Sequence, residues 1–202
     1  MNISFMLESD FTFLHDYVVE EFGGLLGTGA LNVPLIYFPL LQGRPEHNGE
    51  WLKVKAKSGK TWVGVFAFGP GSRSAVISTP EPNTACVISK GRGYLVNADS
   101  PELWEEIRIC PVIDFRLLPE HQLLVVSDFT GLAAYGSNGL VWRSPRVCWD
   151  DLKITKVTSE TVEGTGYDPT NSFKQEMRFA VDVKTGRSLI SPPVSTDGKS
   201  VW

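Results

Sequence analysis

Histidine and cysteine, the residues that most often bind metals or act as nucleophiles, are scarce: the 202-residue sequence has three of each. Cys86, Cys110 and Cys148 stand far apart, and neither a C-x-x-C nor an H-x-x-H spacing occurs. Structural zinc sites are usually marked by such close pairs, so the sequence predicts no metal and no cofactor. Apolar residues flank each cysteine, and we therefore expect three buried, reduced thiols.

Long apolar runs and basic clusters are also missing. The longest apolar run, residues 30–41, is interrupted by Asn32, Pro34 and Pro39, so it is too short and too broken to span a bilayer. Acidic side chains outnumber basic ones by 23 to 19, and no Lys/Arg cluster offers a surface for a phosphate backbone. We therefore expect neither a membrane nor a nucleic-acid partner.

The N-terminus lacks the basic stretch of a secretory signal, and with the reduced thiols this predicts a cytoplasmic protein. A composition of 42% hydrophobic and 21% charged residues is typical of a folded protein, and we expect a single domain over residues 1–202. Residues 1–50 carry seven acidic side chains and one basic side chain. We expect them to form an acidic helix and an irregular covering segment, with a β-rich body over residues 51–202.

Two short helices are predicted. The first rests on apolar residues that recur at spacings of three, four and four, namely Phe11, Leu14, Val18 and Phe22. This amphipathic N-terminal helix would end at Gly23 and carry Asp16, Glu20 and Glu21 on its outer face. The second helix is expected near residues 101–107, with a proline in its first turn.

From residue 51 onward the hydrophobic period changes to two, which indicates strands. A hairpin is expected from residues 51–57 and 61–68, followed by short strands at 75–78, 84–89 and 93–97. The second half predicts four more hairpins: 112–118 with 123–127, 131–135 with 140–143, 152–157 with 161–166, and 177–183 with 187–190. The expected fold is mainly β, with antiparallel hairpins that form open blade-like sheets or a sandwich.

Two phrases in the second half, LAAYGSNGLVWR at residues 132–143 and VDVKTGR at residues 181–187, resemble the strand passages of β-propeller blades. The resemblance covers residues 112–190. Two blades cannot close a ring that needs at least four, so the length allows an open pair of blade-like sheets or a sandwich. The resemblance identifies no characterised functional family and so implies no site residue.

An enzymatic site would have to use Asp128, Asp150, Asp151 and His121. Two carboxylates and an imidazole suffice for acid–base or metal-assisted hydrolysis if they converge. Neighbouring strand residues point to opposite faces, so Asp150 and Asp151 share a pocket only if they lie in a turn. A hydrolase or a metal- or small-ligand-binding pocket is therefore an alternative, which requires three of the four residues within about 8 Å of one another.

The interpretation we favour is a non-catalytic binding protein, of undetermined oligomeric state. Its acidic residues Asp16, Glu20 and Glu21, together with Trp202, would contact a basic protein partner, if they rim a contiguous apolar patch. The six tryptophans allow a further alternative, because exposed tryptophans can stack on sugars. Carbohydrate binding would require two coplanar exposed rings.

Overall fold

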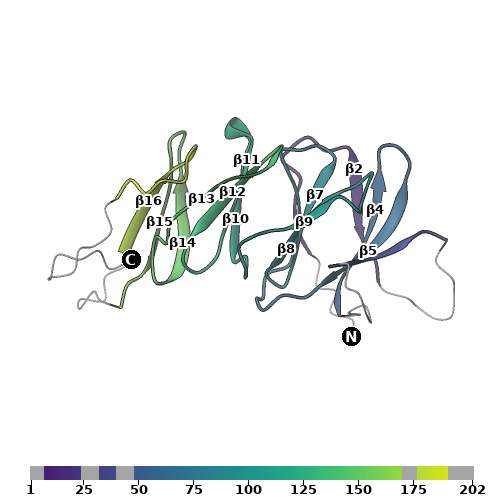
Figure 1. Cartoon of the computed structure of the whole chain (residues 1–202), viewed down its shortest axis with the longest axis horizontal. Coiled ribbons are helices and arrows are strands. Elements are labelled where there is room, and N and C mark those ends of the chain that lie inside the picture. Colours follow the sequence, from purple (N-terminus) through teal and green to yellow (C-terminus); the bar gives the residue numbers. More distant parts are fainter. Residues whose placement is uncertain (1–6, 24–31, 40–47, 170–176, 191–202) are drawn as a thin grey trace. The chain divides into compact units, whose positions relative to one another are not determined.

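The chain is almost entirely β-structure (Figure 1). The structure, a computed structural model, describes residues 7–23, 32–39, 48–169 and 177–190. Its four sheets are largely antiparallel, which confirms the predicted mainly β fold. The chain divides into two compact units, Met1–Val112 and Ile113–Trp202, which are described separately below as unit 1 and unit 2. The single domain expected over residues 1–202 stays a prediction.

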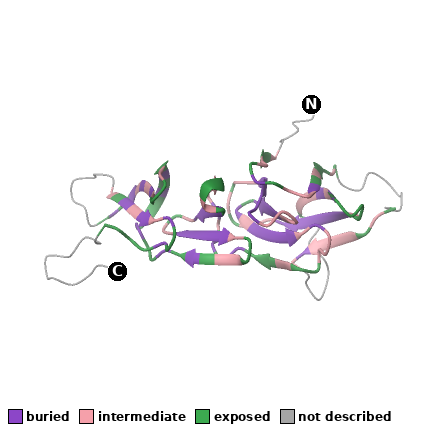
Figure 2. Ribbon diagram, turned by 90° about the horizontal axis from the view of Figure 1, so that it is seen from above, coloured by how far each residue is buried: buried purple, intermediate pink, exposed green. Residues whose placement is uncertain are grey.

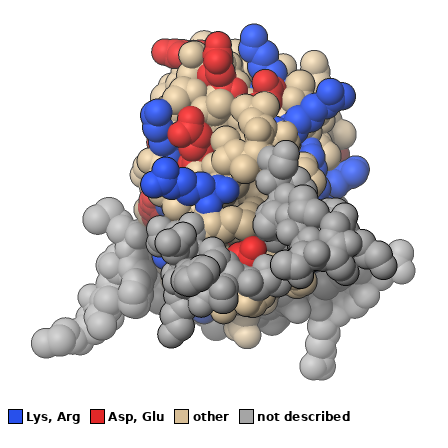
Figure 3. Space-filling view, turned by 90° about the vertical axis from the view of Figure 1, so that its left-hand side faces the viewer, with Lys and Arg blue, Asp and Glu red and all other residues tan. Residues whose placement is uncertain are grey.

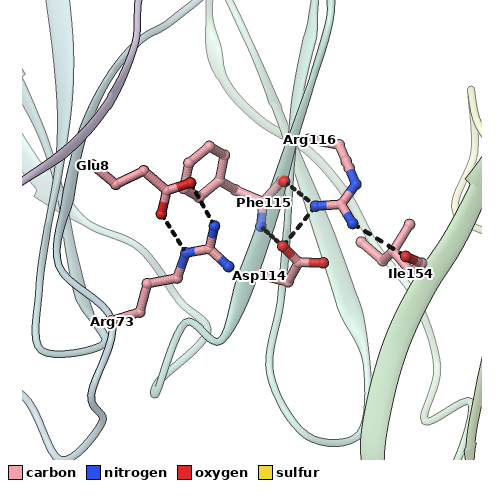
Figure 4. A network of polar contacts seen from close by, with 6 residues as sticks. All are labelled: Glu8, Arg73, Asp114, Phe115, Arg116 and Ile154. Atoms are coloured by element: carbon pink, nitrogen blue, oxygen red, sulfur yellow. Dashed lines mark hydrogen bonds and ion pairs between the residues drawn. The ribbon is translucent and has the colours of Figure 1, made fainter.

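Unit 1 contains two sheets. The first has the strand order β2-β4-β5-β3 and is formed by β2 (Tyr17–Glu21), β4 (Gly49–Ala56), β5 (Thr61–Ala67) and β3 (Leu35–Phe38). The second follows the chain from β6 to β9, with β1 added in parallel beside β6; its strands are β1 (Glu8–Asp10), β6 (Ala75–Ser78), β7 (Thr84–Ser89), β8 (Arg92–Asn97) and β9 (Trp104–Glu106). An ion pair of 2.8 Å between Arg73 and Glu8 helps to hold β1 in place (Figure 4).

The two sheets of unit 1 pack through one apolar core, which appears as buried ribbon in Figure 2. Large side chains of that core use their polar atoms to connect the sheets. The Trp62 indole N–H on β5 donates to the carbonyl oxygen of Ala98 at 2.8 Å, and the Tyr94 hydroxyl on β8 donates to that of Ala67 at 2.9 Å. Because buried donors are costly to leave unpaired, these bonds also fix how the sheets face each other.

Unit 2 is also built from two sheets, both antiparallel throughout. The first contains β10 (Asp114–Leu118), a single 3₁₀ turn η1 (Pro119–His121), β11 (Leu123–Ser127), β12 (Leu132–Gly136) and β13 (Gly139–Arg143); the second contains β14 (Asp150–Val157), β15 (Thr161–Tyr167) and β16 (Met177–Asp182). The first three hairpins predicted in this half are confirmed. The fourth is present as one bridge, between Val181 and Ser188.

Two polar contacts join the sheets of unit 2 around their shared core. The Trp142 indole N–H donates to the carbonyl oxygen of Val183 at 2.9 Å. The Arg116 guanidinium on β10 donates to the carbonyl oxygen of Ile154 on β14 at 3.1 Å and is held by Asp114 at 2.6 Å (Figure 4). Each contact joins a side chain of the first sheet to a backbone carbonyl group. Arg116 reaches the second sheet itself, and Trp142 reaches the segment that follows it.

The predicted N-terminal amphipathic helix is wrong. Tyr17–Glu21 is strand β2, paired antiparallel with β4. The apolar stripe is not one face: Leu14 and Val18 are 80% and 55% exposed, whereas Tyr17 is buried. A helix this short is marginal by itself, and a β-branched Val-Val pair beside an available strand gains a ladder of hydrogen bonds instead.

The short helix predicted near residues 101–107 is wrong as well. Its second half is β9, which pairs with β8, and its first half is a turn. The Asn97 side-chain oxygen accepts the backbone N–H groups of Asp99 and Ser100 at 3.0 and 2.9 Å, which starts that turn. The described residues contain no helix long and apolar enough to cross a membrane.

The strands β6–β9 and β10–β13 follow the same sequence pattern. Identical residues lie 38 positions apart in the pairs Val87 and Val125, Ser89 and Ser127, Gly93 and Gly131, Trp104 and Trp142, Arg108 and Arg146, and Cys110 and Cys148. Each of these stretches encodes a four-stranded antiparallel run followed by an R-(I/V)-C segment. We call them the first and second repeat.

Candidate binding surface

Among the described residues of unit 2, three large aromatic side chains are exposed. Phe129 is 45% exposed, Trp149 36% and Tyr167 51%. They come from the loop after β11, the loop before β14 and the end of β15. Together with Asp128, Arg146 and Asp150 they form what we call the aromatic loop surface.

Hydrogen bonds hold the backbone under this surface together. The Trp149 N–H donates to the carbonyl oxygen of Tyr167 at 2.9 Å. The buried Cys148 thiol donates to the carbonyl oxygen of Phe129 at 3.3 Å, and the Val147 N–H to that of Thr130 at 2.8 Å. The three aromatic residues therefore stand on backbone segments that are bonded to one another, which limits how far their side chains can move apart.

Asp128 shapes the loop that presents Phe129. Its Oδ1 accepts the backbone N–H groups of Thr130 and Gly131 at 2.7 and 2.8 Å and the Thr130 hydroxyl at 3.0 Å. This is the turn-forming use of aspartate, and it occupies one carboxylate oxygen. Asp150 is exposed, and its Oδ1 accepts the N–H of Asp151 at 2.8 Å.

Asp128 and Asp150 both influence the Cys148 thiol. Burial raises the pKa of the Cys148 thiol to about 11, and the carboxylates of Asp150 and Asp128 also raise it. A backbone hydrogen bond at Asp150 and the guanidinium of Arg146 act in the opposite direction. Cys148 is thus a protonated structural thiol, and the two carboxylates and Arg146 are its charged neighbours.

Arg146 also contacts the exposed indole. Its guanidinium carbon lies 4.9 Å from the centre of the Trp149 ring, within the range of a cation–π contact. This contact supports one side of the ring and reduces the rotamer freedom that Trp149 would lose on binding.

The four residues of the predicted catalytic constellation are not all brought together. Asp128 and Asp150 both act electrostatically on Cys148, but His121 lies in η1 at the opposite end of β11, roughly 16 Å away at 3.3 Å per strand residue. Asp151 has a left-handed backbone with φ of 53° and forms an exposed ion pair with Lys153 at 2.8 Å. No group of three potential metal ligands occurs within the described residues.

The residues predicted to contact a partner do not form a common face. Asp16 is paired with Lys57 at 2.9 Å, and Glu21 accepts the N–H of Leu7. Glu20 and Glu21 are neighbours on a strand and so point to opposite faces, with Glu20 in register with Lys53. The single acidic face depended on the helix that does not form. Trp202 lies outside the described residues.

Away from Asp150 and Tyr167, the described side chains on the exposed side of the β14–β16 sheet are mainly charged. Figure 3 shows basic and acidic side chains interspersed on this side of the molecule. Lys153 pairs with Asp151 at 2.8 Å and Lys156 with Glu163 at 3.9 Å, both exposed to solvent. Exposed pairs of this kind contribute little to stability and are typical of a solvated face.

Sequence reasoning missed Phe129, Tyr167 and Arg146, yet a signal for the surface is present in the repeats. The turn Lys90-Gly91 of the first repeat aligns in sequence with Asp128-Phe129 of the second, where the loop is two residues longer, because Ser89 pairs with Arg92 but Ser127 pairs with Leu132. Likewise, Pro111-Val112 corresponds to Trp149-Asp150. In the first repeat, Gly91 and Pro111 pack so closely that a Cβ on Gly91 would lie 2.7 Å from the Pro111 Cβ. The second repeat places exposed aromatic residues at both positions.

The three cysteines differ in exposure. Cys86 and Cys148 are buried as expected, but Cys110 is exposed, so the prediction of three buried thiols is wrong for that residue. Apolar neighbours in the sequence do not bury Cys110 because it lies in the segment that follows the last strand of its sheet, where Ile109 points inward and Cys110 outward.

Alkylation of the native protein with iodoacetamide at pH 8 is expected to modify Cys110 alone. Cys86 is fully buried with a raised pKa, and a thiol with a pKa of about 11, such as Cys148, is only about one part in a thousand thiolate at pH 8. Mass spectrometry should show one adduct before unfolding and three in urea. Equal labelling rates for Cys148 and Cys110 would contradict the described burial.

Comparison with known proteins gives no family for this chain: no protein-family model matches it, and no curated protein matches its sequence.

Proposed function

We propose that this chain is a non-catalytic binding protein and that the aromatic loop surface is where a protein partner binds. The observation that carries the proposal is the exposure of Phe129, Trp149 and Tyr167 beside Arg146 on hydrogen-bonded loops. Scattered exposed apolar residues need no explanation, but these three lie on loop segments whose backbones are bonded to one another. Trp, Tyr and Arg are also the residues most enriched in the energetic centres of protein interfaces.

The repeat comparison supports the same proposal. The first repeat forms its four strands with Gly91 and Pro111 at the sequence positions that align with Phe129 and Trp149, and with a shorter turn between β7 and β8. An aromatic residue at these positions is therefore unnecessary for the strand pattern, and its presence in the second repeat calls for another explanation. Recognition is the simplest one, because loops on a rigid scaffold commonly carry binding residues.

We further propose that residues 112–190, which include the second repeat, contain blade-like units related to those of β-propellers, and that the first repeat is a unit of the same kind. A run of four antiparallel strands is the composition of a propeller blade, and a spacing of 38 residues is close to the roughly 40–45 residues of common blade repeats. The reduced thiols support a cytoplasmic location.

Carbohydrate binding is the second candidate, and Trp149 is the observation in its favour. Trp149 is exposed, whereas Trp62 and Trp142 are buried. A sugar site would need Tyr167 or Phe129 as its second ring. We favour a protein partner because Arg146 already occupies part of the Trp149 surface on which a sugar would stack.

Trp149→Ala is expected to weaken binding by at least about 30-fold, as for the loss of roughly 2 kcal/mol at an interface centre. The measurement is a screen of the whole chain against arrays of purified proteins and defined glycans, followed by titration of each ligand found. Leu103→Ala is the matched control, because Leu103 is a large exposed apolar residue of unit 1. Ligands that bind Trp149→Ala as tightly as the wild-type chain would contradict the proposal, and a Trp149-dependent glycan would assign the surface to sugars.

A further inference from the structure

We infer that the partner segment bound by the aromatic loop surface is basic, with a Lys or Arg side chain that meets Asp128 and Asp150 while its apolar part lies against Phe129 and Trp149. This inference rests on the proposed function and adds the chemistry of the partner. It is carried by the charge difference between the repeats, by the open carboxylate oxygens and by the placement of Arg146.

The two repeats differ in charge where the surface is built. In the first repeat, the two-residue turn at residues 90–91 and the segment at residues 107–112 contain Lys90 and Arg108 and no acidic residue, a net charge of +2. The corresponding segments of the second repeat, residues 128–130 and 145–150, contain Asp128, Arg146 and Asp150, a net charge of −1. The same loops have thus become both acidic and aromatic.

Both carboxylates keep bonding capacity for a partner. The hydrogen bonds of Asp128 and Asp150 all go to their Oδ1 atoms, and their donors lie within three residues along the chain. Among the described residues, neither aspartate forms an ion pair with a basic side chain. A neutral partner that covered these oxygens would remove their hydration without replacing it, whereas an ammonium or guanidinium group would form charge-assisted hydrogen bonds.

Arg146 does not neutralise the two aspartates by direct pairing. Its guanidinium lies over the Trp149 ring, and no ion pair with Asp128 or Asp150 is present in the described part of the chain. The arginine therefore supports the indole while the carboxylates stay open. Complementary charge across an interface mainly increases specificity and association rate, so the basic group should select the partner and the aromatic residues should hold it.

The test is a random library of 12-residue peptides displayed on phage, selected on the wild-type chain and counter-selected on Trp149→Ala. We expect the recovered peptides to be enriched in Lys or Arg, with a net charge of at least about +2. Synthetic copies should bind Asp128→Asn/Asp150→Asn at least 10-fold more weakly, and with a smaller salt dependence, than the wild-type chain. Asn keeps the Oδ1 acceptor that shapes each turn, so these variants remove charge without removing the turn bond.

Two controls keep the outcomes distinct. Glu160→Gln removes an exposed carboxylate from another turn of unit 2 and should change affinity less than twofold. If the double variant is unstable, Asp150→Asn alone serves as the test, and it should lose part of the affinity. Neutral or acidic peptides that depend on Trp149, or basic peptides that bind the Asn variants unchanged, would overturn this inference and leave the binding function intact. Recovery of no Trp149-dependent peptide would overturn both.

Discussion

Replacement of Gly164 by alanine is expected to destabilise unit 2 by about 3 kcal/mol or more. Gly164 is buried at the centre of β15, in register with Ile154 on β14 and Phe179 on β16. An added Cβ would collide with the carbonyl oxygen of Lys153, which is backbone, and would lie 2.6 Å from the Phe179 ring. The strand pair must separate or the ring must leave its place. Overpacking that shifts side chains and backbone typically costs about 1–3 kcal/mol and occasionally more, and the direct clash with a backbone carbonyl places Gly164→Ala at the upper end of that range.

Urea unfolding followed by circular dichroism measures this effect. Gly23→Ala is the control, because a Cβ at Gly23 would meet nothing within 4 Å and its backbone needs no left-handed conformation. We expect that change to stay within about 0.5 kcal/mol of the wild-type free energy of unfolding. Equal midpoints for the two variants would contradict the pairing of β14, β15 and β16 as described.

The second large effect separates two tryptophans that stand seven residues apart. Trp142→Ala is expected to cost about 3–5 kcal/mol, because the ring is 6% exposed in the core of unit 2 and its indole N–H donates to Val183. Trp149→Ala should cost less than about 1 kcal/mol, because the Trp149 ring is partly in solvent already. The same urea titrations provide both numbers.

Trp142→Phe isolates the hydrogen bond from the apolar packing. It keeps most of the ring but leaves the Val183 carbonyl oxygen without this donor, so we expect a loss of about 1–3 kcal/mol. Trp149→Ala should therefore be the most stable of the three variants, Trp142→Phe the next and Trp142→Ala the least stable. A Trp149→Ala variant as unstable as Trp142→Ala would mean that Trp149 is a core residue and would remove the basis of the aromatic loop surface.

Local sequence information was sufficient for most of the hairpins. The β4–β5 hairpin was predicted because alternation stops at Ser58-Gly59-Lys60, and Gly59 has the positive φ of 93° that such a turn requires. The N-terminal segment failed for the opposite reason. Its 3-4-4 apolar spacing coexists with a period-two pattern at Tyr17 and Val19, and only pairing with β4, more than 30 residues away, decides between them.

The candidate site was only partly accessible from the sequence. The sequence pointed to Asp128 and Asp150 as candidates for acid–base chemistry. It pointed to Trp149 only as one of six tryptophans. Neither composition nor period distinguishes Trp149 from the buried Trp142, because exposure depends on what packs against each ring. Comparison of the two repeats would have identified Phe129 and Trp149, since it shows aromatic residues where the first repeat has Gly91 and Pro111.

The most direct test of the binding surface compares Trp149→Ala with the wild-type chain in two assays on the same preparation, affinity for a selected ligand and urea unfolding. We predict an affinity at least about 30-fold lower with an unfolding free energy changed by less than about 1 kcal/mol. An unchanged affinity for every ligand of the chain would show that the aromatic loop surface is not where this protein binds its partner.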